Sequence, residues 1–136
     1  MKGLRIFVDS DVIISSLISE KGAAYFLLGK QKANFVISNI SRIEIEKVTN
    51  RLGLDQTKLK SLIKRKFKVV KLTKGITSIK KDLKDYTSDP NDTHIVSGAI
   101  KAKAKFLLTY NLRHFNRLML SKDLGINVLT PAQYLQ

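Results

Sequence analysis

The stretch that decides the fold is Leu4-Arg5-Ile6-Phe7-Val8, which runs directly into Asp9, Ser10 and Asp11. Because this run is almost continuously apolar, it is typical of a parallel strand that is buried on both faces of a sheet. The two aspartates would then lie where the strand ends. Carboxylate oxygens at such a place are hard ligands that suit Mg²⁺ or Mn²⁺.

Four more short strands are expected at residues 33–38, 67–72, 106–109 and 126–129. Helical segments separate them, at 11–18, 22–29, 39–52, 55–66, 76–86 and 92–105, and a last helical turn begins at Pro131. Gly29 and Gly53 are expected to end two of these helices. Short strands that alternate with helices predict a parallel sheet. We therefore expect residues 1–136 to form one domain, an α/β fold built as a three-layer α/β/α sandwich around a central parallel sheet of about five strands.

The chain is strongly basic, with 25 Lys and Arg against 11 Asp and Glu and a formal net charge of +14. Such an excess attracts phosphate backbones, although a lysine-rich protein with solvated helix faces is an alternative. Lysine outnumbers arginine, which favours contact with the backbone of a nucleic acid over the reading of bases. A basic body around an acidic site is what an enzyme acting on nucleic acid needs.

Several kinds of protein are excluded or disfavoured by composition. There is no cysteine, so disulfides, thiolate zinc sites and thiol nucleophiles are excluded, and a reducing cytoplasm is the expected location. No apolar stretch approaches the roughly 20 residues that span a membrane. No signal peptide is expected, because the N-terminus leads directly into the first strand.

A second acidic motif, Asp89-Pro90-Asn91-Asp92, opens the most regular of the expected helices. Ligands of open parallel sheets bind beyond the carboxyl ends of the strands, where Asp9, Asp92 and Asn111 are all expected. Glu44 joins them, because on a helix it lies beside the buried stripe of Ile40 and Val48.

Each of these positions also has a simpler explanation. Asp9 could only cap the following helix, and Glu44 could be a half-exposed surface residue. Asp89, Pro90 and Asp92 make a regular helix start by themselves. The argument for a site is that separate polar positions are all expected at one end of one sheet.

These residues together resemble the PIN domain, a metal-dependent ribonuclease family that includes VapC-type toxins. The resemblance covers the whole chain. It rests on four segments in order: Phe7–Val12, Ser38–Glu44, Asp89–Asp92 with Ala99 downstream, and Leu107–Phe115.

The resemblance implies that Asp9 is the family's first acid, Glu44 its helix glutamate and Asp92 its third acid, which together hold Mg²⁺ or Mn²⁺. Asp89 matches an extra acid found in one branch of the family. Asn111 stands where many members carry a fourth aspartate. Asp11 stands where many carry asparagine, and it could compensate for the lost charge.

The implied activity is endonucleolytic cleavage of RNA by a metal-activated water, with Thr109 or Ser10 orienting that water and lysines holding the RNA. A toxin-type member would also have a small antitoxin partner and form a homodimer. Two alternatives stay open at this point. One is a catalytically silent RNA-binding domain of the same fold, which Asn111 favours. The other is a phosphatase similar to haloacid dehalogenases, because Asp9-Ser10-Asp11 follows a strand.

Overall fold

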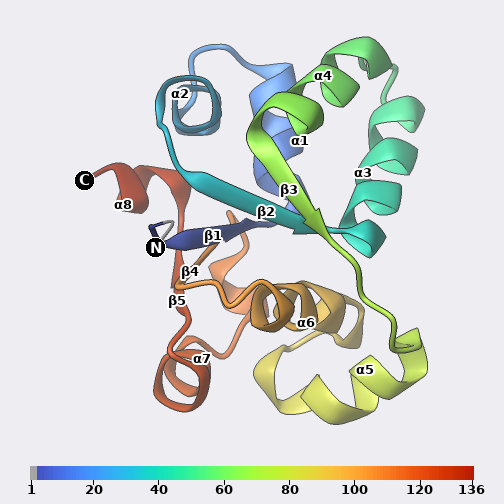
Figure 1. The fold of residues 1–136 in the computed structure, drawn as a ribbon, viewed down its shortest axis with the longest axis vertical. Coiled ribbons are helices and arrows are strands. Elements are labelled where there is room, and N and C mark those ends of the chain that lie inside the picture. Colours follow the sequence, from blue (N-terminus) through green and yellow to red (C-terminus); the bar gives the residue numbers. More distant parts are fainter. Residues whose placement is uncertain (1–2) are drawn as a thin grey trace.

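A computed structural model describes residues 3–136 and shows a five-stranded sheet with helices on both faces (Figure 1). The expected three-layer α/β/α architecture is therefore confirmed. Met1 and Lys2, which the predicted domain includes, lie outside the described residues. The strands are β1 (Arg5–Val8), β2 (Asn34–Ser38), β3 (Phe67–Val70), β4 (Phe106–Leu108) and β5 (Asn127–Leu129).

All neighbouring strands are parallel, in the order β3-β2-β1-β4-β5. The strand β1 is central, where Ile6 pairs with Phe35 of β2 on one side and with Phe106 of β4 on the other. Its last three residues are buried. The continuous apolar run at the start of the chain is explained by this central position, because both faces of β1 are covered.

Two hydrophobic cores lie on opposite faces of the sheet. Ile6, Val8, Phe35 and Ile37 point into one core, and Phe7, Val36 and Leu107 point into the other. The first core is covered by α1 (Ser10–Ile18), α2 (Ala23–Lys30), α3 (Asn39–Arg51), α4 (Gln56–Lys66) and α8 (Pro131–Leu135). The second is covered by α6 (Thr93–Lys101) and α7 (Arg117–Leu124), with α5 (Ile76–Leu83) packed on α6.

The helix α6 approaches β1 more closely than a side chain at Gly98 would allow. A Cβ built at Gly98 would lie 2.4 Å from Cζ of Phe7, a ring that is fully buried. Because the ring is enclosed, it has no free space to move into. Gly98 therefore sets how near α6 comes to β1.

Some of the expected helix limits were wrong. The helix α7 was not expected at all, although Asn116 caps its start and Gly125 ends it in the left-handed conformation. Gly29 does not end α2, because it lies inside that helix and Gln31 is the residue that follows it. The helix α6 ends at Lys101 and not at residue 105, and a 3₁₀ turn, η2 (Pro90–Asp92), precedes it.

Within the described residues, no single helix is long and apolar enough to cross a membrane. Only α1 and α2 taken together reach that length, and they are bent by 97° relative to each other.

Candidate active site

Asp9 directly follows β1 and caps α1. Its Oδ1 accepts a hydrogen bond of 2.7 Å from the backbone N–H of Ser10, and its Oδ2 accepts one of 2.9 Å from the hydroxyl of Thr109. The residue is 7% exposed. The capping explanation is therefore correct as far as it goes, but capping uses only one of the two carboxylate oxygens.

Asp11 lies beside Asp9, one residue into α1. Its Oδ2 accepts hydrogen bonds from the backbone N–H of Tyr110 at 2.9 Å and from the side-chain amide of Asn111 at 3.1 Å. The hydroxyl of Thr109 is 3.3 Å from the same oxygen. The other oxygen, Oδ1, is buried and has no hydrogen-bond partner among the described residues. Asp11 thus reaches the same place as Asp9, and Asn111 is bonded to it.

Carboxylates gather at this place without enough compensating charge. Burial and the charge of Asp11 raise the pKa of Asp9 to about 7, and Asp92 adds to the effect. Burial also raises the pKa of Asp11 and of Asp92. Thr109 has a single hydroxyl proton, so it cannot donate to Asp9 and Asp11 at once. A cation at this position would stabilise the ionised form of all three carboxylates.

Glu44 lies in the second turn of α3, which follows β2 and is capped by Ser38. Its Oε1 accepts a hydrogen bond of 3.1 Å from the hydroxyl of Ser10, and its Oε2 is 3.6 Å from Nε2 of His94. The pKa of Glu44 is lowered, mainly by the hydrogen bond with His94. The side chain is 45% exposed, so the half-exposed alternative describes it correctly, yet Ser10 links it to Asp9.

Asp92 occupies the last position of η2 and the capping position of α6, but its side chain makes no capping hydrogen bond. Its Oδ2 instead lies 3.0 Å from Nδ1 of His114. Asp89 accepts a hydrogen bond of 2.9 Å from the backbone N–H of Asn91 and is exposed. Asp89 therefore holds the turn in place and acts on Asp92 through its charge, which raises the pKa of Asp92.

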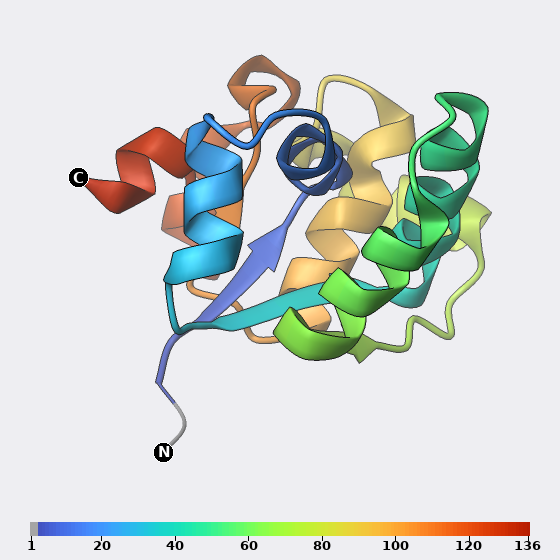
Figure 2. The same ribbon diagram turned by 90° about the horizontal axis from the view of Figure 1, so that it is seen from above.

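The positions of Asp9, Asp11, Glu44, Asp92 and Thr109 define what we call the carboxyl edge of the sheet. In Figure 2, β1 runs upward into α1, the helix that begins at this edge.

His94 was missed by the sequence analysis. It is buried on α6, and its Nδ1 has no partner among the described residues. The sequence signal was present, because a histidine stands beside Ile95 and Val96 at the start of the most apolar helix. His114 was not expected as a partner of Asp92 either. Both histidines hold an acid at the carboxyl edge.

The residues at the carboxyl edge fit a hard divalent cation in their chemistry. They offer oxygen donors, a buried carboxylate oxygen without a partner, and three carboxyl groups with raised pKa. As these side chains stand, however, no three His, Asp or Glu residues in the described part of the chain converge closely enough to hold an ion. Glu44 and Asp92 are each turned to a histidine, and both would have to leave that partner to share one cation.

Fold and site together define a class of protein, a parallel α/β domain with an acidic centre at the carboxyl edge of its sheet. The chain belongs to the PIN domain family, whose PIN domain model matches residues 5–113. The expected family is thereby confirmed. The phosphatase alternative is set aside. No curated protein matches the chain significantly.

Solved structures of toxin–antitoxin proteins share the fold. A toxin–antitoxin complex from Klebsiella pneumoniae aligns with a TM-score of 0.66 and 18% identity, over 93% of this chain and 97% of that one. VapBC-1 from Haemophilus influenzae aligns with a TM-score of 0.62 and 18% identity, over 95% and 99%. VapC20 from Mycobacterium tuberculosis, a toxin that cleaves the sarcin–ricin loop, aligns with a TM-score of 0.55 and 16% identity, over 75% and 86%. At these identities the similarity establishes the fold.

Proposed function

We propose that the chain is a Mg²⁺- or Mn²⁺-dependent endoribonuclease whose active site is the carboxyl edge. The observation that carries the proposal is the pairing of Asp9 and Asp11 across Thr109 next to Asp92, with raised pKa values and a buried Oδ1 of Asp11 that has no partner. An arrangement of this kind is unfavourable for folding unless a bound ligand uses it. Membership of the PIN domain family supports the same conclusion.

Asp9, Glu44 and Asp92 would hold the cation, with Asp89 and Asp11 adding negative charge beside them. When bound, the cation would activate a water for attack on a phosphodiester and stabilise the developing negative charge. Thr109 fixes the orientation of Asp9 through a 2.9 Å hydrogen bond. His94 and His114 hold Glu44 and Asp92 in place before the ligand arrives.

Asn111 has a different role in this proposal from that of a metal ligand. Its side-chain amide donates to Asp11 at 3.1 Å, so it restrains Asp11 and stabilises its negative charge by hydrogen bonding. We infer that Asp11 supplies the carboxylate that many relatives carry at the position of Asn111. The charge of the site is then kept, although it comes from α1 instead of the segment after β4.

RNA is the proposed substrate, and an antitoxin is a proposed partner. The excess of positive charge supports binding to a polyanion. The fold neighbours include a toxin that cleaves the sarcin–ricin loop and two toxin–antitoxin assemblies, which is why we extend both roles to this chain. A homodimer, a cytoplasmic location and the one-domain boundary stay predictions from the sequence.

Cleavage of a structured RNA with and without Mg²⁺ tests the proposal. We expect cleavage by the wild-type chain, with Mg²⁺ required, and its loss in the Asp9→Asn and Asp92→Asn variants. Asp82→Asn is the matched control, because Asp82 is an exposed acid on α5 that pairs only with Lys74 among the described residues. Equal cleavage by all four proteins would refute the site. Binding without cleavage by any of them would favour the silent RNA-binding domain.

A further inference from the structure

Basic residues collect at the opposite end of the sheet from the carboxyl edge. In a parallel α/β fold, the segments that lead from a helix into a strand all meet at the amino ends of the strands. Here these segments bring Lys32 before β2, Arg65 and Lys66 before β3, and Lys103 and Lys105 before β4. Residues 28–34, 63–68 and 100–106 contain no acid. The segments that lead into β2, β3 and β4 therefore bring positive charge alone to this end of the sheet.

Three shallow hollows overlap at this end of the molecule, with volumes of about 310, 610 and 210 Å³. The 310 Å³ hollow lies between the other two. It shares Arg65 and Lys66 with the 610 Å³ hollow and Arg5 and Lys68 with the 210 Å³ hollow, so the three form one trough. We call its basic lining the basic edge, made of Arg5, Lys32, Arg65, Lys66, Lys68, Lys101 and Lys103.

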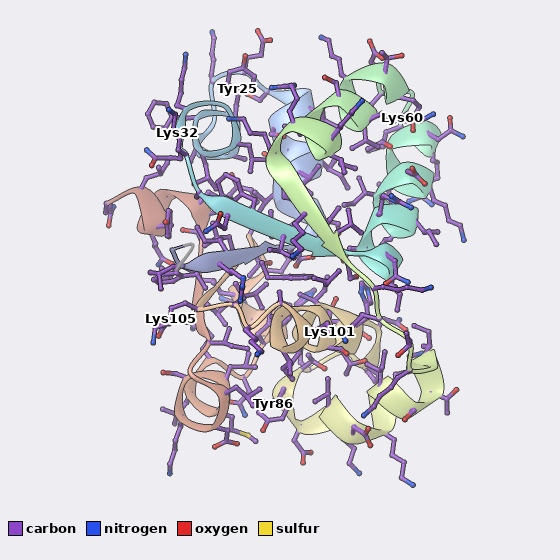
Figure 3. All side chains as sticks on the ribbon, viewed as in Figure 1. Tyr25, Lys32, Lys60, Tyr86, Lys101 and Lys105 are labelled. Carbon is purple, nitrogen blue, oxygen red and sulfur yellow. The ribbon has the colours of Figure 1, made fainter. Side chains whose placement is uncertain are left out.

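None of the cations of the basic edge has an acidic partner. No Asp or Glu lines the trough, and no ion pair involves these seven residues in the described part of the chain. Figure 3 shows Lys32 and Lys105 on the side of the sheet where β1 and β2 begin, and Lys101 on α6. Like charges held this close repel one another, so the edge is suited to a ligand with repeated negative charge.

We propose that the basic edge binds the sugar-phosphate backbone of single-stranded RNA, as a second contact surface away from the acidic site. Residues of three neighbouring strands, β1, β2 and β3, line the trough. Neighbouring strands lie ~4.8 Å apart, so the trough is roughly 10 Å long across the sheet and can hold more than one phosphate. The choice of RNA rests on the proposed function. RNA bound at the basic edge does not meet the carboxylates. Only a longer RNA molecule would reach both the basic edge and the carboxyl edge.

A nucleic acid fits the trough better than a membrane surface does. The lining is concave, and Leu4 is the one exposed large apolar side chain among its described residues. Binding to a bilayer requires apolar side chains that insert beside the charges. The lysines supply point charges, which suit a backbone regardless of base sequence.

Binding of a fluorescently labelled 20-nucleotide uridine RNA in EDTA tests this inference without cleavage. The triple variant Lys32→Gln, Lys68→Gln and Lys101→Gln removes exposed charges from all three hollows. The matched control, Lys47→Gln, Lys60→Gln and Lys81→Gln, removes the same charge from exposed positions on α3, α4 and α5. We expect the first variant to bind at least about tenfold more weakly and its salt slope to fall by roughly 2, because each phosphate contact contributes about 0.7. The control should stay within about threefold of wild type by the same counting, because it loses no trough contact.

Equal weakening in the two triple variants would overturn the proposal, since the effect would then be one of net charge. It would also be overturned if the first variant kept its affinity for RNA and lost affinity for vesicles of phosphatidylserine and phosphatidylcholine. The result is separable from the ribonuclease proposal. Binding is measured in EDTA, so a chain that binds RNA through this edge but never cleaves it refutes only the proposed function. A chain that cleaves RNA while the first variant binds as wild type refutes only the basic edge.

Discussion

The two edges of one sheet carry opposite chemistry. At the carboxyl edge, Asp9, Asp11 and Asp92 come together with raised pKa values, and His114 pairs with Asp92. At the basic edge, seven Lys and Arg residues line a trough without a single carboxylate. Because all five strands are parallel, each one begins at the end of the sheet that carries the basic edge and finishes at the end that carries the carboxyl edge.

This difference shows how a parallel fold sorts charge. Segments that follow strands and segments that precede them end on opposite sides of the sheet, so a sequence can segregate acids and bases simply by placing them in alternate connections. The net charge of +14 is therefore not spread evenly around the site. A basic body around the acidic site was expected from the sequence. Lys101 and Lys103 lie instead at the opposite end of the sheet from that site.

Substitutions at one edge at a time test whether the two edges have separate roles. We expect Asp92→Asn to lower the rate of RNA cleavage roughly 10²–10³-fold, because a charge at the reacting centre is lost, while affinity for RNA in EDTA is unchanged. The triple Lys32, Lys68 and Lys101 variant should behave in the reverse way, with weaker binding but cleavage restored at saturating RNA. If either variant loses binding and cleavage together while still folded, the two edges are not separate.

The position of α6 sets the geometry of the carboxyl edge, and Gly98 tests it. We expect Gly98→Ala to lower the free energy of unfolding by about 1–3 kcal/mol, because the added methyl would overlap the buried ring of Phe7. Urea denaturation measures this change.

Gly29→Ala is the matched control for that substitution. Gly29 is also helical, but a Cβ there meets nothing within 4 Å. Its replacement should raise the stability by up to about 1 kcal/mol, as alanine favours helix. Similar effects of the two substitutions would contradict the close approach of α6 to β1.

Stability without metal should depend on pH through the carboxyl edge. The pKa of Asp9 is raised to about 7 in the folded chain and is ordinary, about 4, when unfolded. Between these values the folded state holds a proton that the unfolded chain has lost, so stability falls as pH rises through this range. The urea midpoint, measured in EDTA, should therefore fall more between pH 5 and pH 8 for wild type than for Asp9→Asn. Asp82→Asn should keep the wild-type fall, and an equal fall in Asp9→Asn would rule out the buried pair as its cause.

Asn111 gives the smallest expected effect. In the Asn111→Asp variant a carboxylate would face Asp11 in place of an amide donor, so without metal we expect a loss of roughly 0.5–1 kcal/mol of stability at pH 8. Mn²⁺ should bind this variant more tightly than wild type. Asn50→Asp, on the exposed face of α3, controls for the added charge. Weaker binding of Mn²⁺ in Asn111→Asp would mean that Asn111 is needed as it is.

The strands could be predicted because burial on both faces leaves a continuous apolar signal. All five expected strands are present, and β1, expected to be buried on both faces, lies at the centre of the sheet. The helix α7 was missed, and only Leu120 among its four apolar residues is buried. Gly29 was misread as a stop because the sequence does not show whether a glycine is followed by further helical hydrogen bonds.

The site was harder to predict than the fold. That Asp9, Glu44 and Asp92 belong to one end of the sheet follows from the topology, but their partners do not. The bonds of Asp11 to Tyr110 and Asn111 join residues about a hundred positions apart, and only the pairing of β1 with β4 brings them together. His94 reaches Glu44 because α3 and α6 meet beyond the strands, a contact between helices that no local pattern encodes.

Thermal unfolding in the presence of Mn²⁺ tests the central claim most directly. The claim is that the carboxyl edge of the folded chain binds a divalent cation. We expect the melting temperature of wild type to rise with Mn²⁺ at pH 8, by mass action on the folded state, and Asp82→Asn to follow it. Asp9→Asn and Asp92→Asn should show little or no rise. No rise in wild type at millimolar Mn²⁺, or an equal rise in Asp9→Asn, would contradict the account.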